Sequence, residues 1–347
     1  MPERRPPGFG RTPVVAPDGP PVLDDAAAAA LLPERLVRGH KGTFGKLLVL
    51  AGSLDYAGAA ILVCRAAGRA GAGLVTLAVP ESLQPLFAAR VLEATTMALP
   101  EDDVEEVDPE AALARILDHS HDALAVGPGL RPGLATTALI QALLATPEDE
   151  DGTAPPVLLD AEALRSLASA EGWWEGWRRL AVLTPHAGEF GRLRSASGRD
   201  PAADGDLDAD DAARAAATAD AAREWGQVVV MKGARTVIAS PGGEIAVAPF
   251  ENPALASGGT GDVLSGTIGS LLAQGLAPFA AASLGVYLHG LAGEAVRHRL
   301  GDAGLLASDL PDEIAFARRR LAALAPRAIA GRRVGFGLRE DAGGAKT

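Results

Sequence analysis

A glycine-rich segment, residues 256–266 (ASGGTGDVLSG), opens directly into an apolar stretch with the spacing of a helix. Its glycines let backbone N–H groups approach a ligand closely, and the helix expected to begin near Gly261 presents free amides and its positive dipole end to an anion such as phosphate. Asp262 stands at the same helix start. It is either an ordinary first-turn acid or a general base beside a phosphoryl group. The glycines favour the base, because a capping aspartate needs no glycine run before it, whereas developing phosphoryl charge needs nearby amides.

A second candidate site follows the strand-like run at 227–231 and consists of Lys232, Gly233, Ala234, Arg235 and Thr236 (KGART). A lysine at the end of a strand is often only a solvated surface residue. Here it precedes a glycine and two side chains that carry a cation and a hydroxyl. We therefore interpret this segment as a nucleotide loop.

Further polar or glycine positions follow strand-like runs, where open α/β sheets bind ligands. His186 and Glu189 lie in LTPHAGEF, which is either an ordinary strand-to-helix turn, with Glu189 favoured by the helix dipole, or one edge of a ligand crevice. Gly127 and Gly129 form a Gly-Pro-Gly turn that either lines a site or only reverses the chain. Asp160, in VLLDAEAL, is expected to cap the next helix.

Several tempting motif matches fail. Residues 39–47 resemble a phosphate-binding P-loop, but the glycine spacing is too long and leucine replaces the required hydroxyl residue. The third glycine after the turn at 127–129 comes one position too late for a dinucleotide fingerprint. No nucleophile elbow of the serine hydrolases is present. His289 and Glu294 are within helical reach of each other, but two residues do not make a metal site.

The elements that must position these residues are short apolar runs alternating with helical patterns. The strand-like runs lie at 46–52, 74–80, 122–130, 156–164, 180–190 and 227–233. Continuous apolar strands separated by helices are typical of a parallel sheet covered on both faces, which predicts an α/β fold. Two runs that flank SPGGE predict an antiparallel hairpin at the edge of the sheet. Helices are expected over 260–274, 278–299 and 305–324.

The composition of the chain limits the classes of partner that it is expected to bind. The chain has 347 residues, a formal net charge of -12 and a pI of about 5.0, without a basic run, so we expect no nucleic acid and no anionic membrane surface as partner. The single cysteine excludes an intrachain disulfide framework and fits a reducing cytoplasm. No uninterrupted apolar stretch is long enough to span a bilayer, and the first residues lack the apolar core of a signal peptide. We expect a flexible arm at 1–24, one domain at 25–326 and a flexible tail at 327–347.

A resemblance to one known family covers nearly everything from His40 to about Arg299. The segments that carry it, in order, are HKGTFGKLLVLAGS, YAGAAILVCRAAGRAGAGLVTLAVP, AVGPGL, LLDAEAL, LTPHAGEF, VVVMKGARTVIASPGG, NPALASGGTGDVLSG and LGVYLHGLAGE. Together they closely resemble the NAD(P)H-hydrate dehydratases of the ribokinase-like superfamily. The resemblance implies a three-layer α/β/α sandwich. It also implies the repair of hydrated NADH or NADPH (NADHX or NADPHX) with ADP or ATP, by phosphorylation of the ring hydroxyl and loss of phosphate.

The resemblance assigns roles to positions in this chain. It makes Asp262 the base that deprotonates the hydroxyl, with Gly261 and adjoining amides on the transferring phosphate. It places Ala60, Gly129 and His186 at the hydrated nicotinamide, and Lys232 to Thr236 with Gly261 at the adenine nucleotide. Magnesium is implied by the phosphate chemistry, although no carboxylate cluster in the sequence locates it.

Two departures and two alternatives stay open. Many family members carry an N-terminal epimerase domain, for which the residues before the first helical pattern are too few, so we expect a stand-alone dehydratase with a separate epimerase. Arg235 stands where a small residue is common in the family.

Two alternative functions stay open. The first is a small-molecule alcohol kinase of the same superfamily, and the second is a non-catalytic nucleotide-binding regulator. The compact chain favours ADP over ATP without deciding between them. The preference between NADHX and NADPHX is open, and a homotetramer is suggested only by the resemblance.

Overall fold

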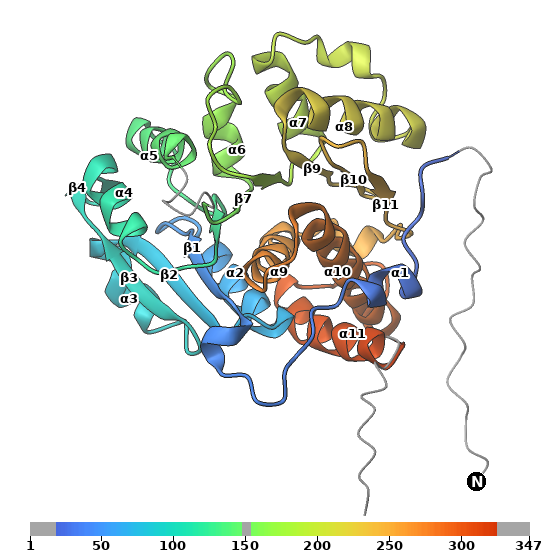
Figure 1. Ribbon diagram of the computed structural model, residues 1–347, viewed down its shortest axis with the longest axis horizontal. Helices are drawn as coiled ribbons and strands as arrows, with labels where there is room; N and C mark the ends of the chain where they lie inside the picture. The colour runs from blue at the N-terminus through green and yellow to red at the C-terminus, as the bar shows by residue number, and fades with distance from the viewer. Residues whose placement is uncertain (1–18, 148–153, 325–347) are drawn as a thin grey trace, which may run out of the picture.

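The computed structural model describes residues 19–147 and 154–324, and its main feature is a nine-stranded sheet (Figure 1). The strand order is β11-β10-β9-β8-β7-β6-β1-β2-β3. Seven of these strands run parallel: β1 (Lys46–Leu50), β2 (Leu74–Pro80), β3 (Thr95–Leu99), β6 (Ala123–Val126), β7 (Val157–Leu159), β8 (Ala181–Leu183) and β9 (Val228–Met231). Their carboxyl ends therefore meet along one edge of the sheet.

Helices cover both faces of this sheet (Figure 1). One face carries α1 (Asp25–Ala30), α2 (Ala57–Ala70), α3 (Gln84–Ala88), α9 (Thr260–Ala273), α10 (Pro278–Leu300) and α11 (Leu310–Leu324). The other carries α4 (Pro109–Leu117), α5 (Leu134–Ala145), α6 (Glu162–Leu167), α7 (Ala187–Ala196) and α8 (Asp211–Trp225). The three-layer α/β/α sandwich expected from the sequence is confirmed.

The central strands are apolar at every position because both of their faces are buried. In β1, Leu47 and Val49 belong to the hydrophobic core under α2 and α9, whereas Leu48 and Leu50 belong to the core under α4 and α5. Successive side chains of a strand point to opposite faces, so a strand between two helical layers needs apolar residues throughout.

The edge hairpin is also confirmed. β10 (Val237–Ala239) pairs antiparallel with both β9 and β11 (Ile245–Val247). Ser240 closes the turn, because its backbone N–H donates to the Glu244 carbonyl at 2.9 Å. Val22, which lies in the expected N-terminal arm, forms a bridge with Val247 of β11. Residues 1–18 of that arm and the expected tail at 327–347 lie outside the described residues.

Three features differ from the sequence-based expectations. The edge strand β3 and the small antiparallel pair β4 (Glu101–Asp103) and β5 (Glu106–Val107) were not recognised, because they are short and partly polar. The third C-terminal helix, α11, begins at Leu310 after a 3₁₀ turn at Ala307–Asp309. In addition, α10 is long and apolar enough to cross a membrane by length and composition, but 72% of its most apolar window is buried in the fold, as in the core helix of a globular protein.

Helix α9 is held against α2 by close backbone contact. A Cβ atom at Gly266 would lie 2.3 Å from the Val63 carbonyl oxygen, so only glycine lets the two helices approach this far. This contact fixes where the first turn of α9 meets the sheet.

Candidate active site

The polar residues that follow three neighbouring strands meet at the carboxyl edge of the sheet. Asp160 follows β7, His186 comes three residues after β8, and Lys232 follows β9. The first turn of α9, with Gly261 and Asp262, begins at the same edge. A Cβ atom at Gly261 would lie 3.7 Å from Lys232 Nζ and 3.8 Å from Asp160 Oδ2. The fold thus brings together residues from four segments of the chain, and Asp160 and Ser265 of α9 are 105 positions apart in the sequence.

A buried ion pair forms the centre of this cluster. Lys232 Nζ lies 2.7 Å from Asp160 Oδ1, and the hydroxyl of Ser265 donates to Asp160 Oδ2 at 2.6 Å. Asp160 is only 2% exposed. The expectation that Asp160 caps the next helix is wrong, because Ala161 is the N-cap of α6 and the Asp160 carboxylate is turned toward Lys232 and α9.

Glu189 adds a second carboxylate beside the lysine. Its Oε2 lies 3.7 Å from Lys232 Nζ and accepts a hydrogen bond from the backbone N–H of His186 at 2.9 Å. Burial lowers the pKa of Lys232, but the charges of Asp160 and Glu189 outweigh burial and hold that pKa above its ordinary value. Lys232 is therefore a charged ammonium at every physiological pH.

Asp262 occupies the first turn of α9, next to this cluster. Burial raises the pKa of Asp262 to about 7, and the negative charge of Asp160 raises it further than the positive charge of Lys232 lowers it. A carboxyl group with a pKa near neutrality is matched to taking up and releasing a proton at the operating pH. This is the chemistry that a general base requires.

A pocket of about 570 Å³ opens beside the cluster. Its walls come from the loop after β9, the segment after β11, the start of α9 and one side of α10. The lining residues are Lys232, Gly233, Ala234, Thr236, Ala248, Phe250, Glu251, Asn252, Pro253, Leu255, Ala256, Thr260, Gly261, Leu264, Val286, His289 and Gly290. A mainly apolar wall with a few polar groups is the usual form of a small-molecule site.

The structure places four of the five residues of the predicted nucleotide loop, and Gly261, on the wall of this pocket. Arg235 is the one residue of the loop Lys232–Thr236 that does not line the pocket. Its backbone has a φ of 53°, and its Nε lies 3.2 Å from Asp211 Oδ2 at the start of α8. Arg235, which stands where a small residue is common in the family, therefore forms an ion pair with Asp211 of α8.

His289, on the wall of the pocket, supports the first turn of α9. Its Nε2 lies 2.9 Å from the Thr260 carbonyl oxygen, to which the neutral ring donates. Burial lowers the pKa of His289 to about 4, so the ring stays neutral at physiological pH. Among residues 19–147 and 154–324, no three His, Cys, Asp or Glu side chains are placed together to hold an ion.

The three residues that the resemblance assigns to the substrate lie farther apart than the residues of the Lys232 cluster. Gly129 has a φ of +67°, a conformation that favours glycine, and packs against Tyr56 and Ala59 at the start of α2. Ala60 lies beside them, fully buried in the core. His186 caps α7: its Nδ1 accepts from the Gly188 backbone N–H at 3.0 Å.

His186 is 54% exposed and reaches the Lys232 cluster only through Glu189, whose Oε2 lies 3.5 Å from His186 Nε2. The substrate assignments of Ala60, Gly129 and His186 therefore remain predictions.

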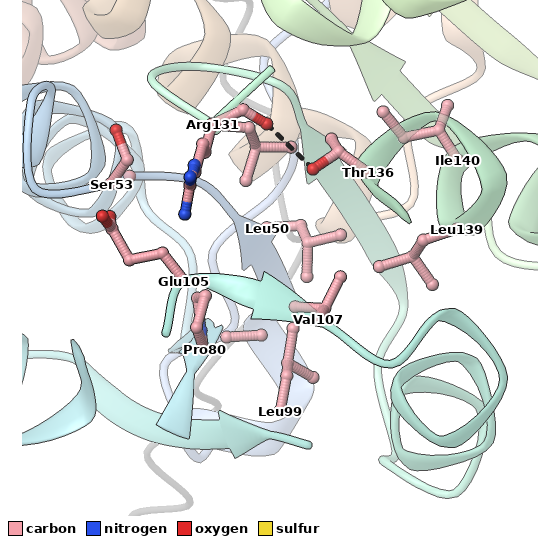
Figure 2. Close-up of a pocket in the computed structure, with 13 residues that line it drawn as sticks. Leu50, Ser53, Pro80, Leu99, Glu105, Val107, Arg131, Thr136, Leu139 and Ile140 are labelled. Carbon is pink, nitrogen blue, oxygen red and sulfur yellow. Dashed lines mark hydrogen bonds between the residues drawn. The ribbon is translucent and has the colours of Figure 1, made fainter. Parts of the chain in front are cut away.

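A smaller pocket lies near Ser53, Glu105 and Arg131, and its interior is lined by apolar side chains (Figure 2). Its volume of about 20 Å³ has room for one or two water molecules and excludes a nucleotide.

Sequence reasoning missed Asp160, Glu189 and Ser265 as members of the cluster. Each has an ordinary local explanation: a strand-end acid, a first-turn acid and a small residue in a packed helix. The signal that could have found Asp160 is its position directly after a buried strand, where an uncompensated carboxylate is costly and a lysine after a neighbouring strand is a suitable partner.

Comparison with known proteins gives a consistent result. A sequence model of the NAD(P)H-hydrate dehydratase family matches residues 47–315. The chain is 39% identical over 303 residues to the bifunctional NAD(P)H-hydrate repair enzyme Nnr of Moorella thermoacetica, covering 86% of this chain and 54% of that protein. It is 36% identical over 286 residues to the ADP-dependent (S)-NAD(P)H-hydrate dehydratase of Neisseria meningitidis, covering 81% of this chain and 88% of that protein. The chain thus spans about half the length of the bifunctional relatives.

Solved structures agree. The ADP/ATP-dependent NAD(P)H-hydrate dehydratase of Bacillus subtilis, co-crystallised with ATP and Mg²⁺, superposes with a TM-score of 0.72 at 32% identity, covering 88% of this chain and 99% of that one. A ribokinase-like superfamily protein of Enterococcus faecalis shares the fold, with a TM-score of 0.70 at 23% identity. From the extent of the sequence match and these structural likenesses, we conclude that the chain belongs to the NAD(P)H-hydrate dehydratase family.

Proposed function

We propose that this protein restores NADH and NADPH from the S form of their hydrates, NADHX and NADPHX, in a dehydration driven by ADP or ATP. The observation that carries the proposal is the position of Asp262. Its carboxyl group, with a pKa raised to about 7, stands in the amide-rich first turn of α9 beside the charged Lys232 and the pocket. Family membership supplies the substrate class, since the relatives are named for this reaction.

In the proposed mechanism, Asp262 takes the proton from the hydroxyl group of the hydrated ring as the terminal phosphoryl group of the nucleotide moves to that oxygen. The free backbone amides at the start of α9, including that of Gly261, stabilise the charge on the transferring group. The C–O bond then breaks and phosphate leaves with its bridging oxygen, while the adjacent ring carbon loses a proton to solvent, so that the ring regains its double bond. ADP is converted to AMP, or ATP to ADP.

The adenine nucleotide is proposed to occupy the pocket of about 570 Å³, with its phosphates directed toward Lys232 and Gly261. The apolar wall suits a purine base, and the ammonium group of Lys232 suits phosphate. Lys232 is 19% exposed, so its ammonium group remains within reach of a ligand while Asp160 and Glu189 hold it in place.

The hydrated nicotinamide is proposed to enter along the carboxyl edge of the sheet, between Gly129, which packs against the start of α2, and His186, the N-cap of α7. Support comes from the parallel sheet, because Gly129 follows β6 and His186 follows β8, and the carboxyl ends of both strands lie at the edge where α9 begins. We also propose a cytoplasmic location, which the single cysteine favours. On the basis of the resemblance, we propose a separate enzyme that epimerises the hydrate, and a homotetramer.

Magnesium fits this site as a companion of the nucleotide. Mg²⁺ keeps several waters and takes one or two protein carboxylates together with substrate phosphates, and Glu189 offers a carboxylate beside Lys232. When bound, the ion would neutralise phosphate charge.

The experiment that tests the proposal is the recovery of NADH absorbance in the near ultraviolet from purified S-NADHX, with Mg²⁺ and with ADP, ATP or neither. Recovery only when a nucleotide is present would support the dehydratase and name the phosphate donor. If the protein binds nucleotide without recovering NADH, the alcohol-kinase alternative would replace the proposal. Asp262→Asn is the matched control, and full recovery by that variant would exclude Asp262 as the base.

A further inference from the structure

Arg214 of α8 is a buried arginine whose guanidinium group binds backbone. Its side chain is 2% exposed. Nε donates to the Leu207 carbonyl at 2.5 Å, Nη2 donates to the Asp208 carbonyl at 3.2 Å, and Nη1 donates to the carbonyl of Ala234. All three guanidinium nitrogens are therefore used, and Ala234 lies in the middle of the loop that follows β9.

The other ends of this loop are held by separate contacts. The Lys232 backbone N–H donates to the Pro185 carbonyl at 2.8 Å, and the Arg235 N–H donates to the Phe250 carbonyl at 2.8 Å. Between these two anchors, the guanidinium group of Arg214 packs directly under Gly233, where a Cβ atom would lie 2.8 Å from Nη1. Arg214 is thus the support that reaches the centre of the loop from α8.

The partners of Arg214 are unusual for a buried arginine. Arg194, the comparable buried arginine of α7, is paired with the carboxylates of Asp204, Asp220 and Glu224 at 2.8 to 3.0 Å. For Arg214 the carboxylate of Asp208 is 3.8 Å away and 80% exposed. An arginine kept only for stability gains more from close carboxylates than from carbonyl groups. Its rigid fork of donors is suited instead to fixing several carbonyl groups in one geometry.

We propose that Arg214 is a positioning residue that holds the loop Lys232–Thr236 in the shape that binds the nucleotide. It acts through the loop, since it is not among the described residues on the pocket wall. The inference rests on the proposed function, which assigns this loop to the adenine nucleotide. A loop fixed before binding costs less ordering on binding, so a loss of its support appears as weaker nucleotide affinity.

The test compares Arg214→Lys with Arg194→Lys, a matched change at a buried arginine that does not contact the loop. For each variant, the Kd for ADP and for ATP is measured by calorimetry, kcat is measured at saturating nucleotide, and stability is measured by urea denaturation. We expect Arg214→Lys to raise the nucleotide Kd about tenfold and to leave kcat at saturation within about twofold, because a charged hydrogen bond to the loop is lost but the reacting groups stay in place. Arg194→Lys should lower stability and leave the nucleotide Kd within about twofold.

Each outcome decides the matter. An unchanged Kd in a folded Arg214→Lys variant, or an equal rise in both variants, would overturn the inference while leaving the proposed function intact. If Arg214→Lys does not fold, Gly233→Ala tests the same contact from the loop, and wild-type affinity in that variant would overturn the inference. A wild-type protein that binds neither nucleotide would overturn the proposed function first, and this inference with it.

Discussion

Lys232 Nζ and Asp160 Oδ1 lie 2.7 Å apart at the ends of β9 and β7, across the intervening strand β8. The pair holds a lysine that would otherwise swing into solvent, and it places that ammonium group close to the first turn of α9. A buried charge pair is costly to build and more costly to break, so its contribution to this site can be measured by removing one partner at a time.

Asp160→Asn should lower the free energy of unfolding by about 3 kcal/mol, because it leaves the Lys232 charge buried without its closest carboxylate. Urea denaturation at neutral pH measures this loss. Ser265→Ala, which removes only one neutral donor to the same carboxylate, is the matched control and should cost about 1 kcal/mol. Equal losses in the two variants would mean that the ion pair contributes nothing beyond its hydrogen bonds.

Lys232→Ala should weaken nucleotide binding more than it slows turnover at saturating nucleotide, by about tenfold or more in Kd, because the lysine charge faces the proposed phosphate position. The single variant also leaves Asp160 unpaired. The double variant Lys232→Met/Asp160→Asn, which removes both charges, is therefore the control for folding. A nucleotide affinity that stays at the wild-type value in both would remove Lys232 from the site.

Asp262→Asn should leave nucleotide binding nearly intact and lower turnover at least about a hundredfold, the scale of a lost general base. Steady-state rates of NADH recovery and a binding isotherm measure the two quantities separately. Glu110→Gln, at an exposed first-turn acid of α4, controls for the loss of a helix-start carboxylate and should change neither. Similar losses of binding and turnover at Asp262 would contradict its role as base.

The pattern of apolar strands and helices was sufficient to predict the layers, the direction of the central strands and the edge hairpin, since each depends on burial along one short segment. It was not sufficient to predict β3, whose positions are partly polar because one side of the strand is open. The small residues of α9 indicate a closely packed helix, but they do not identify the element that it contacts. That packing depends on Gly266 meeting the backbone of α2, a contact between distant segments.

The same limit applies to the site. Asp262 and the loop after β9 could be singled out because glycines beside a charged residue are a local signal. Asp160 and Glu189 carry no such signal, since an acid at a helix start is explained by the helix alone. The strand order is needed to show that both acids lie beside the same lysine, Lys232, next to the start of α9. The contact of Arg214 with the loop after β9 likewise depends on the fold, because Arg214 is not part of a glycine motif.

Turnover should depend on the deprotonated fraction of Asp262. With a pKa raised to about 7, the carboxylate is lost progressively as the pH falls below neutrality. We expect kcat/KM for the hydrate to fall about tenfold for each pH unit below about pH 6. A profile measured at saturating nucleotide and Mg²⁺ tests this. A profile that is flat down to about pH 5 would require another residue to act as base.

Stability should show the opposite dependence on pH. The folded pKa of Asp262, about 7, lies above the ordinary value of 3.8, so the folded state holds the proton more tightly than the unfolded chain. Its contribution to stability is complete below about pH 3.8 and is lost as the pH rises toward 7. Asp262→Asn carries no such charge, so its free energy of unfolding should exceed that of the wild type by a margin that grows from about pH 5 to about pH 8. Urea denaturation across this range measures the margin. A margin that stays constant, or shrinks with rising pH, would mean that the surroundings of Asp262 do not disfavour its carboxylate. The positive charge of Lys232 would then have to offset the effect of burial on the pKa of Asp262.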